Sequence, residues 1–252
     1  MALPQLNSTP SYRITIPSIG KKTTFRPFLV KEQKALLIAY ETQDKTDIVR
    51  AITRTIHACV EEPIEETLTT FDIDYLFTQI RAKSVGEVVD LTIKCEECGM
   101  ANDVSIELDD IEMTQEVQED ILKLTDDVSL KMRYPSYEDF LANEKLLNTE
   151  SMTESLMELV VVCLDSVLTE EERFSIKDEP REDVINFIDS MTSEQFEMVT
   201  EFVQNMPAIS KDVDFTCAGC KHENEEGGPG PQAQVHVQCH DVGRVRTVQP
   251  RA

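Results

Sequence analysis

The sequence predicts an α+β fold. We expect a small β platform that carries split, zinc-ribbon-like knuckle strands, with helical segments at the N-terminus and inserted in the middle. Three observations support this prediction. Apolar and polar residues alternate over short runs near residues 12–16, 88–93, 104–108 and 128–132, as in half-buried strands. Apolar residues recur at three- and four-residue spacing elsewhere, as in amphipathic helices. Two Cys-x-x-Cys pairs, at 95–98 and 217–220, each follow a strand pattern.

The composition excludes several classes of protein. Hydrophobic residues make up 40% of the 252-residue chain, which is enough for a packed core. The formal net charge of -24 would repel a phosphate backbone, so we expect no nucleic-acid partner. No apolar run approaches the ~18–20 residues of a membrane span, and the first ten residues lack a signal-peptide pattern. Seven cysteines, an odd number, favour a reducing compartment with a metal site over a disulfide framework.

Charge is distributed unevenly along the chain. Residues 1–60 carry nine Lys and Arg against four Asp and Glu, whereas residues 61–226 carry twelve against forty-three. Opposed patches of charge steer and register the docking of protein subunits. The pattern therefore indicates contacts with other proteins, although an acidic excess is equally typical of a solvated surface.

The first 84 residues divide into a β segment and a helical region. Residues 1–30 form the N-terminal β segment, with two extended runs around a turn at Pro17–Gly20. Residues 31–84 form the helical region, in which apolar residues follow the period of a helix. The expected helices are Lys31–Tyr40, Thr46–Val60 and Asp72–Lys83.

In the remaining chain, the spacing of apolar residues changes several times between that of strands and that of helices. Residues 85–135 form a β region with the first Cys-x-x-Cys knuckle, and residues 136–206 form a helical insertion. Capping boxes that begin at Ser151 and Thr192 mark helix starts in this insertion. Residues 207–226 form the second knuckle. Residues 227–252 are rich in Gly, Pro and Gln without periodic apolar residues, and we expect this tail to be disordered.

The paired cysteines predict a zinc site. Zinc takes four soft ligands at tetrahedral corners, and two residues between cysteines allow one turn to aim both sulfur atoms at the same ion. A compact ribbon has ~15–20 residues between its pairs, whereas 118 residues lie between Cys98 and Cys217. Four thiolates leave no open position for water, so we expect a structural ion and no catalytic residue. The predicted ligands are Cys95, Cys98, Cys217 and Cys220.

Two other uses of these cysteines remain open from the sequence. A thioredoxin-like redox pair needs a lowered thiolate pKa, which the acidic neighbours Glu96 and Glu97 oppose. A second arrangement would bind the metal locally and would depend on the C-terminal tail. Its ligands would be Cys217, Cys220, Cys239 and His240.

Other reactive residues have plainer interpretations. Cys59 and Cys163 lie on apolar helical stripes and are expected to be core residues. His57 points to a different helix face from Cys59, so a Cys–His catalytic pair is not expected. No glycine-rich phosphate loop follows a strand, which gives nucleotide binding no support.

Several segments resemble a known family. They are Tyr12–Lys21, Thr24–Glu32, Asp74–Phe77 and Ile80–Glu87, and the paired Cys-x-x-Cys motifs fit as well. Together they resemble the baseplate hub subunit, or hub assembly, family of T4-like bacteriophages over residues 10–225. The resemblance implies a protein of virion morphogenesis, made in the host cytoplasm, with other phage baseplate hub proteins as partners and no enzymatic activity. It also implies a further apolar segment after Asn224, where this chain has its Gly- and Pro-rich tail.

Two functions from different classes are consistent with these observations. The first is a non-enzymatic structural or assembly subunit of a contractile-tail phage baseplate hub. It would act through protein contacts, contain a structural zinc, and be found in the host cytoplasm during assembly or in the virion tail baseplate. The alternative is a cytosolic Cys-x-x-Cys thiol oxidoreductase. The charge distribution, the lack of a catalytic constellation and the resemblance favour the first.

Overall fold

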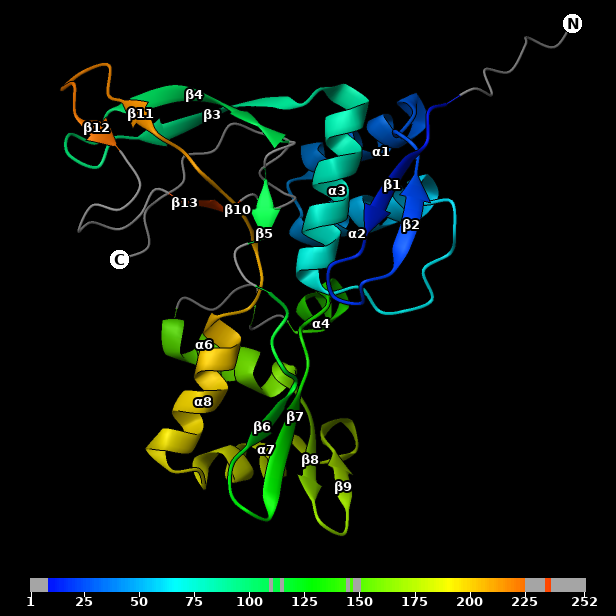
Figure 1. Cartoon of the computed structure of the whole chain (residues 1–252), viewed down its shortest axis with the longest axis vertical. Coiled ribbons are helices and arrows are strands. Elements are labelled where there is room, and N and C mark those ends of the chain that lie inside the picture. Colours follow the sequence, from blue (N-terminus) through cyan, green and yellow to red (C-terminus); the bar gives the residue numbers. More distant parts are fainter. Residues whose placement is uncertain are drawn as a thin grey trace, which may run out of the picture. The chain divides into compact units, whose positions relative to one another are not determined.

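The computed structural model describes residues 9–108, 111–113, 116–143, 146, 151–224 and 234–236, and it shows an α+β protein (Figure 1). Helices alternate with small antiparallel sheets, which confirms the predicted fold class. The described residues form two compact units. The first unit contains those of residues 1–66, 71–114 and 208–252, and the second contains those of residues 67–70 and 115–207. The second unit is therefore inserted in the sequence of the first.

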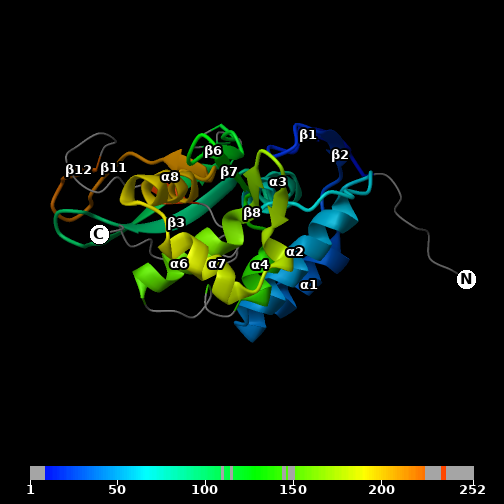
Figure 2. The same ribbon diagram turned by 90° about the horizontal axis from the view of Figure 1, so that it is seen from below.

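The N-terminal part of the first unit is a hairpin with three helices. Strands β1 (Tyr12–Thr15) and β2 (Lys22–Phe25) pair antiparallel, and Gly20 has a left-handed φ of 63° in the connecting turn. Figure 2 shows α1 and α2 side by side. The helices lie close to the three ranges expected from the periodicity: α1 (Val30–Thr42), α2 (Lys45–Cys59) and α3 (Thr70–Val85).

Local hydrogen bonds and apolar stripes account for these helices. Asp44 begins α2, because its Oδ1 accepts hydrogen bonds from the backbone N–H groups of Thr46 at 2.7 Å and Asp47 at 3.3 Å. The Glu32 side chain accepts a hydrogen bond from the Leu29 N–H at 2.8 Å at the start of α1. The apolar stripe predicted for α3 is fully buried: Ile73, Leu76, Phe77 and Ile80.

The middle segment of the first unit contains a long hairpin, β3 (Val88–Lys94) and β4 (Ala101–Glu107). Buried residues of this hairpin, Ile93 and Ile106, pack in one core with Ala82 of α3 and with Ile209 and Val213. These last two residues precede the second cysteine pair. The shared core therefore holds the two cysteine-bearing segments, distant in sequence, against each other.

Short strands complete the first unit. Strand β10 (Ile209–Asp212) pairs antiparallel with β5 (Glu112–Met113), and β11 (Phe215–Thr216) pairs antiparallel with β12 (Glu223–Asn224). Figure 1 shows β11 and β12 beside the tip of the β3–β4 hairpin. Of the tail, the structure describes β13 (Gln234–His236), which pairs with β10. These three residues therefore differ from the expected disorder, and the rest of residues 227–252 lies outside the described residues.

The second unit packs helices on a four-stranded antiparallel sheet of order β6-β7-β8-β9. Its strands are β6 (Ile121–Lys123), β7 (Val128–Met132), β8 (Leu164–Thr169) and β9 (Arg173–Ser175). Its helices are α4 (Tyr137–Ala142), α6 (Met152–Cys163), α7 (Arg181–Asp189) and α8 (Ser193–Gln204), with a 3-10 turn at Ile176–Asp178. Side chains from β7, α6, β8, α7 and α8 form its core.

The boundaries of this unit differ from the helical insertion expected over residues 136–206. Strands β8 and β9 lie inside that range, and β8 pairs with β7, which precedes it. The sheet thus extends the unit back to residue 115. The reason is that the apolar run from Leu159 to Leu164 passes from α6 directly into β8, and a continuous apolar run has no period that separates helix from strand. Among the described residues, no helix has the length and apolar character needed to cross a membrane.

Candidate metal centre

The first knuckle is a tight turn between β3 and β4. The Cys95 N–H donates to the carbonyl oxygen of Met100 at 2.8 Å, and the Gly99 N–H donates to the carbonyl oxygen of Cys95 at 2.8 Å. Gly99 has a left-handed φ of 70°, which glycine adopts without a steric penalty. The turn therefore closes around the two cysteines and returns the chain into β4.

The second knuckle repeats this pattern between β11 and β12. The Cys217 N–H donates to the carbonyl oxygen of His222 at 2.9 Å, and the Lys221 N–H donates to that of Cys217 at 3.1 Å. Lys221 has a φ of 63° and occupies the position that Gly99 has in the first turn. Two segments far apart in the sequence thus form the same local structure.

The two turns bring the four predicted ligands together. Their Sγ atoms all lie within 4.8 Å of one another. Across the knuckles, Cys95 Sγ is 3.6 Å from Cys220 Sγ, and Cys98 Sγ is 3.6 Å from Cys217 Sγ. A tetrahedral zinc with Zn–S distances of about 2.3 Å separates its sulfur ligands by about 3.8 Å. The donor set and its spacing therefore fit one zinc ion.

Two asparagines connect the knuckles crosswise. Asn102 Oδ1 accepts a hydrogen bond from the Ala218 N–H at 2.9 Å, and Asn102 Nδ2 lies 3.7 Å from Cys217 Sγ. Asn224 Oδ1 accepts one from the Glu96 N–H at 3.1 Å, and Asn224 Nδ2 lies 3.7 Å from Cys95 Sγ. Each amide therefore orients the first cysteine of the opposite knuckle, as partners outside the ligand set do in metal sites.

The sequence prediction did not include these asparagines, although a signal for them exists. Each lies four residues after the second cysteine of its pair, in Cys-Glu-Glu-Cys-Gly-Met-Ala-Asn and Cys-Ala-Gly-Cys-Lys-His-Glu-Asn. Aligning the two motifs would have revealed the repeated position. Both side chains are buried, with 8% of Asn102 and 3% of Asn224 exposed.

Backbone N–H groups favour the ionised form of the first cysteine in each pair. The Cys220 N–H, directed at Cys217, lowers the pKa of the Cys217 thiol to about 6 against the effect of burial. The Cys98 N–H likewise lowers the pKa of Cys95. The His222 N–H also favours the Cys220 thiolate, but burial and the three neighbouring sulfur atoms raise the pKa of Cys220 to about 12. A cation bound among these sulfur atoms would favour the thiolate forms that a metal site requires.

The other cysteines singled out in the sequence behave as core residues. Burial raises the pKa of Cys59 to about 11 and that of Cys163 to about 12. His57 is exposed on α2 whereas Cys59 is buried, so the two side chains lie on different faces. Cys239 and His240, the ligands of the alternative site, lie outside the described residues.

Fold and site together define a two-unit α+β protein with a four-cysteine cluster suited to a structural metal. The family model described as T4 bacteriophage base plate protein matches residues 9–227. The chain therefore belongs to this family of phage baseplate proteins, which confirms the resemblance to a T4-like baseplate protein and is compatible with the hub subtype. Membership associates the protein with the virion tail and with a structural role beside other baseplate proteins. Neither the curated proteins nor the solved structures contain a match.

Proposed function

We propose that this protein is a non-enzymatic structural or assembly subunit of the baseplate hub in a contractile phage tail. It acts through contacts with other hub proteins and is present in the host cytoplasm while the tail assembles. Family membership over residues 9–227 carries the proposal. The basic residues 1–60 next to the strongly acidic residues 61–226 support it, because opposed charges register subunits during docking.

We further propose that Cys95, Cys98, Cys217 and Cys220 bind one structural zinc. The close packing of their sulfur atoms supports this assignment. The ion would tie the tip of the β3–β4 hairpin to the β11–β12 turn, and its binding free energy would stabilise the first unit directly. In model zinc peptides that free energy is about 10 kcal/mol or more.

Elemental analysis of the purified chain tests the zinc proposal. We expect one zinc per chain, retained when the chain is truncated after Glu226. Zinc that is lost with the tail would assign the site to Cys239 and His240 instead, and a preparation without metal would refute the proposal.

Genetic and biochemical experiments test the proposed role of the protein in the baseplate hub. The protein should co-purify from infected cells with other hub proteins, and phage that lack it should accumulate incomplete baseplates. Electron microscopy and sedimentation of the lysates measure this outcome. Normal baseplates in the absence of the protein, or no association with any hub protein, would contradict the proposed function.

The alternative, a thiol oxidoreductase, has one observation in its favour. The lowered pKa of Cys217 is typical of a reactive thiol. However, Cys217 is buried with 0% of its surface exposed, and both cysteine pairs lie in turns between strands rather than at the start of a helix. A disulfide-reduction assay separates the two functions, since only the oxidoreductase predicts turnover.

A further inference from the structure

Strand β1 has an outer edge whose backbone groups point away from the sheet. The Ile16 N–H donates to the carbonyl oxygen of Lys21 at 2.9 Å. With the register of the two strands, this bond fixes the phase of the ladder, that is, which residues of β1 direct their backbone groups toward β2. In an antiparallel pair, alternate residues direct their N–H and C=O groups outward. By this phase, Arg13 and Thr15 present four backbone groups on the side opposite β2.

The other side of the hairpin is covered. The Glu61 N–H donates to the carbonyl oxygen of Thr24 at 2.9 Å, and Phe25 forms an isolated bridge with Val60. Within the part of the chain that the structure describes, β1 pairs with β2 alone. The outer edge of β1 is therefore the open edge of this sheet.

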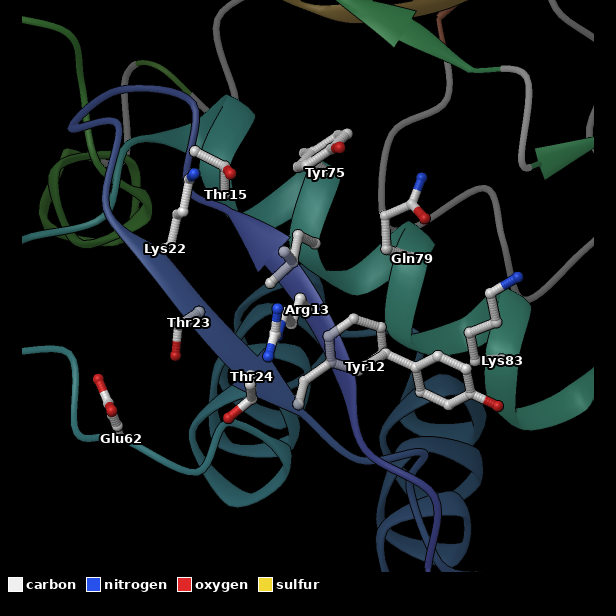
Figure 3. Close-up of a pocket in the computed structure, with 12 residues that line it drawn as sticks. Tyr12, Arg13, Thr15, Lys22, Thr23, Thr24, Glu62, Tyr75, Gln79 and Lys83 are labelled. Carbon is white, nitrogen blue, oxygen red and sulfur yellow. The ribbon is translucent and has the colours of Figure 1, made fainter.

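An open groove of about 700 Å³ is lined by residues of β1 and β2, by Glu62 and by α3, and it borders this edge on the α3 side. Its far wall is α3, on which Tyr75, Gln79 and Lys83 recur every four residues and lie in a row alongside β1 (Figure 3). Extended peptides add to sheets in grooves of this kind, between an open strand edge and a helix. The four residues of β1 offer about 13 Å of edge at ~3.3 Å per residue, enough for four or five residues of an incoming strand.

The groove is basic within an acidic protein. Arg13 and Lys22 are exposed on the same face of the hairpin, and neither forms an ion pair with another described residue. Lys83 adds a third cation, paired with Glu87 at 2.6 Å, while Glu62 is the carboxylate that lines the groove. Charge complementarity therefore favours an acidic segment as the ligand of this groove. Two copies of a chain with a net charge of -24 repel each other, which favours a different protein over self-association.

We propose that the groove between β1 and α3 binds an extended acidic segment of another baseplate protein, which adds to β1 as the third strand of the hairpin sheet. The outward backbone groups of Arg13 and Thr15 supply the hydrogen bonds. The Arg13 and Lys22 side chains select for acidic residues, and Tyr75 provides apolar contact from the facing helix. The inference rests on the proposed role of the chain as a subunit that acts through protein contacts.

Site-specific photocrosslinking of the full-length chain during infection tests this proposal. One variant carries benzoylphenylalanine in place of Gln79, in the groove. A matched variant carries it in place of Lys34, which is exposed on α1 and does not line the groove. We expect the Gln79 adduct, identified by mass spectrometry, to contain an acidic segment of another baseplate protein.

Two sets of substitutions in the groove test the proposed binding mode directly. Thr15→Pro removes one outward N–H and leaves the ladder with β2 intact, because edge strands tolerate proline where the N–H faces away. It should reduce the Gln79 adduct about tenfold, as should Arg13→Glu combined with Lys22→Glu. Thr15→Ala keeps the N–H and should retain the adduct. Circular dichroism and metal content establish that each variant folds.

The outcomes distinguish this proposal from the function on which it rests. Gln79 adducts that map to residues 1–8 of the same chain or to a second copy would overturn it. The proposal would also be overturned if Gln79 gave no adduct, or if Thr15→Pro did not reduce the amount of adduct. If hub proteins still co-purify in those cases, the groove is refuted while the proposed function stands. If no hub protein associates with the unaltered chain, the proposed function itself is refuted.

Discussion

Asn102 and Asn224 occupy equivalent positions on opposite sides of the cysteine cluster, and each binds the knuckle to which it does not belong. Their Oδ1 atoms accept from the residues that follow Cys217 and Cys95, at 2.9 and 3.1 Å. The exchange gives the cluster a local two-fold relationship between the segments that contain residues 95–102 and 217–224. These amide contacts join the two segments in addition to the clustered cysteines.

Replacement of either asparagine should therefore weaken metal binding to a similar degree. We expect Asn102→Ala and Asn224→Ala each to lower zinc affinity about 10–100-fold, the usual effect of losing a partner of a ligand. Competition with a chromophoric chelator measures the affinity. Asn186→Ala, on an exposed position of α7, is the control and should leave affinity unchanged. A large loss for one variant and none for the other would contradict the equivalence of the two contacts.

The effects of two ligand substitutions on zinc content and on stability should be strongly non-additive. Cys98→Ser and Cys217→Ser come from different knuckles, yet both remove the same ion if the four cysteines share it. We expect each to abolish stoichiometric zinc and to destabilise the first unit by several kcal/mol, with little further effect in the double variant.

Metal analysis and hydrogen exchange measure these effects separately. The Cys59→Ala variant is the control, because Cys59 is buried outside the cluster and its loss should leave zinc bound. Amide protection in α6 and α8 should persist in all variants, since the second unit has its own core. Additive destabilisation by the two cysteine variants would indicate separate sites.

The sequence predicted those features in which local pattern and tertiary structure agree. The spacing of Ile73, Leu76 and Ile80 identified one buried face of α3. Phe71, Thr78 and Ala82 on the opposite face are buried as well, which the spacing did not indicate. The Cys-x-x-Cys spacing identified all four clustered thiols because tight turns with paired cysteines have a narrow range of uses.

The remaining features depend on pairing between distant segments. Strand β8 was missed because its identity comes from its register with β7, in which Leu130 is opposite Val167, and not from its own apolar run. The groove beside β1 was not predictable either, because an edge is open only when no other segment pairs with it. The cross-contacts of the asparagines required both knuckles to be in place.

The two left-handed positions in the knuckles should respond differently to substitution. A Cβ added at Gly99 meets no heavy atom within 4 Å, so the cost of Gly99→Ala comes from its φ of 70° alone. We expect a loss of about 1–2 kcal/mol in the free energy of unfolding. Lys221→Gly relieves the same strain but adds unfolded-state entropy, so its effect should stay within about 1 kcal/mol. Guanidinium denaturation of the metal-loaded protein measures both, and a neutral Gly99→Ala would contradict the assigned backbone conformation.

A carboxylate in the second unit should make its stability depend on acidic pH. Asp139 receives two hydrogen bonds from the Arg133 guanidinium, at 2.7 and 2.9 Å, and one from the Ser136 N–H at 2.8 Å. Burial raises the pKa of Asp139, but Arg133 and Ser136 outweigh it and hold the pKa below its ordinary value of 3.8. A carboxyl group with a lowered pKa stabilises the fold fully above its ordinary pKa, and this contribution disappears as the pH falls through the lowered value.

The Asp139→Asn variant should accordingly be less stable than the parent at pH 7, by on the order of 2 kcal/mol, the range for hydrogen bonds to charged groups. The difference should shrink only below about pH 4, where the parent carboxylate begins to accept a proton. Hydrogen exchange of α6 amides at several pH values follows the second unit separately from any acid-induced loss of metal in the first. Asp126→Asn is the control, because that carboxylate is 98% exposed beside Lys123 and should contribute little at any pH. A difference between parent and Asp139→Asn that is constant from pH 7 to pH 2 would show that the carboxylate charge does not stabilise this unit.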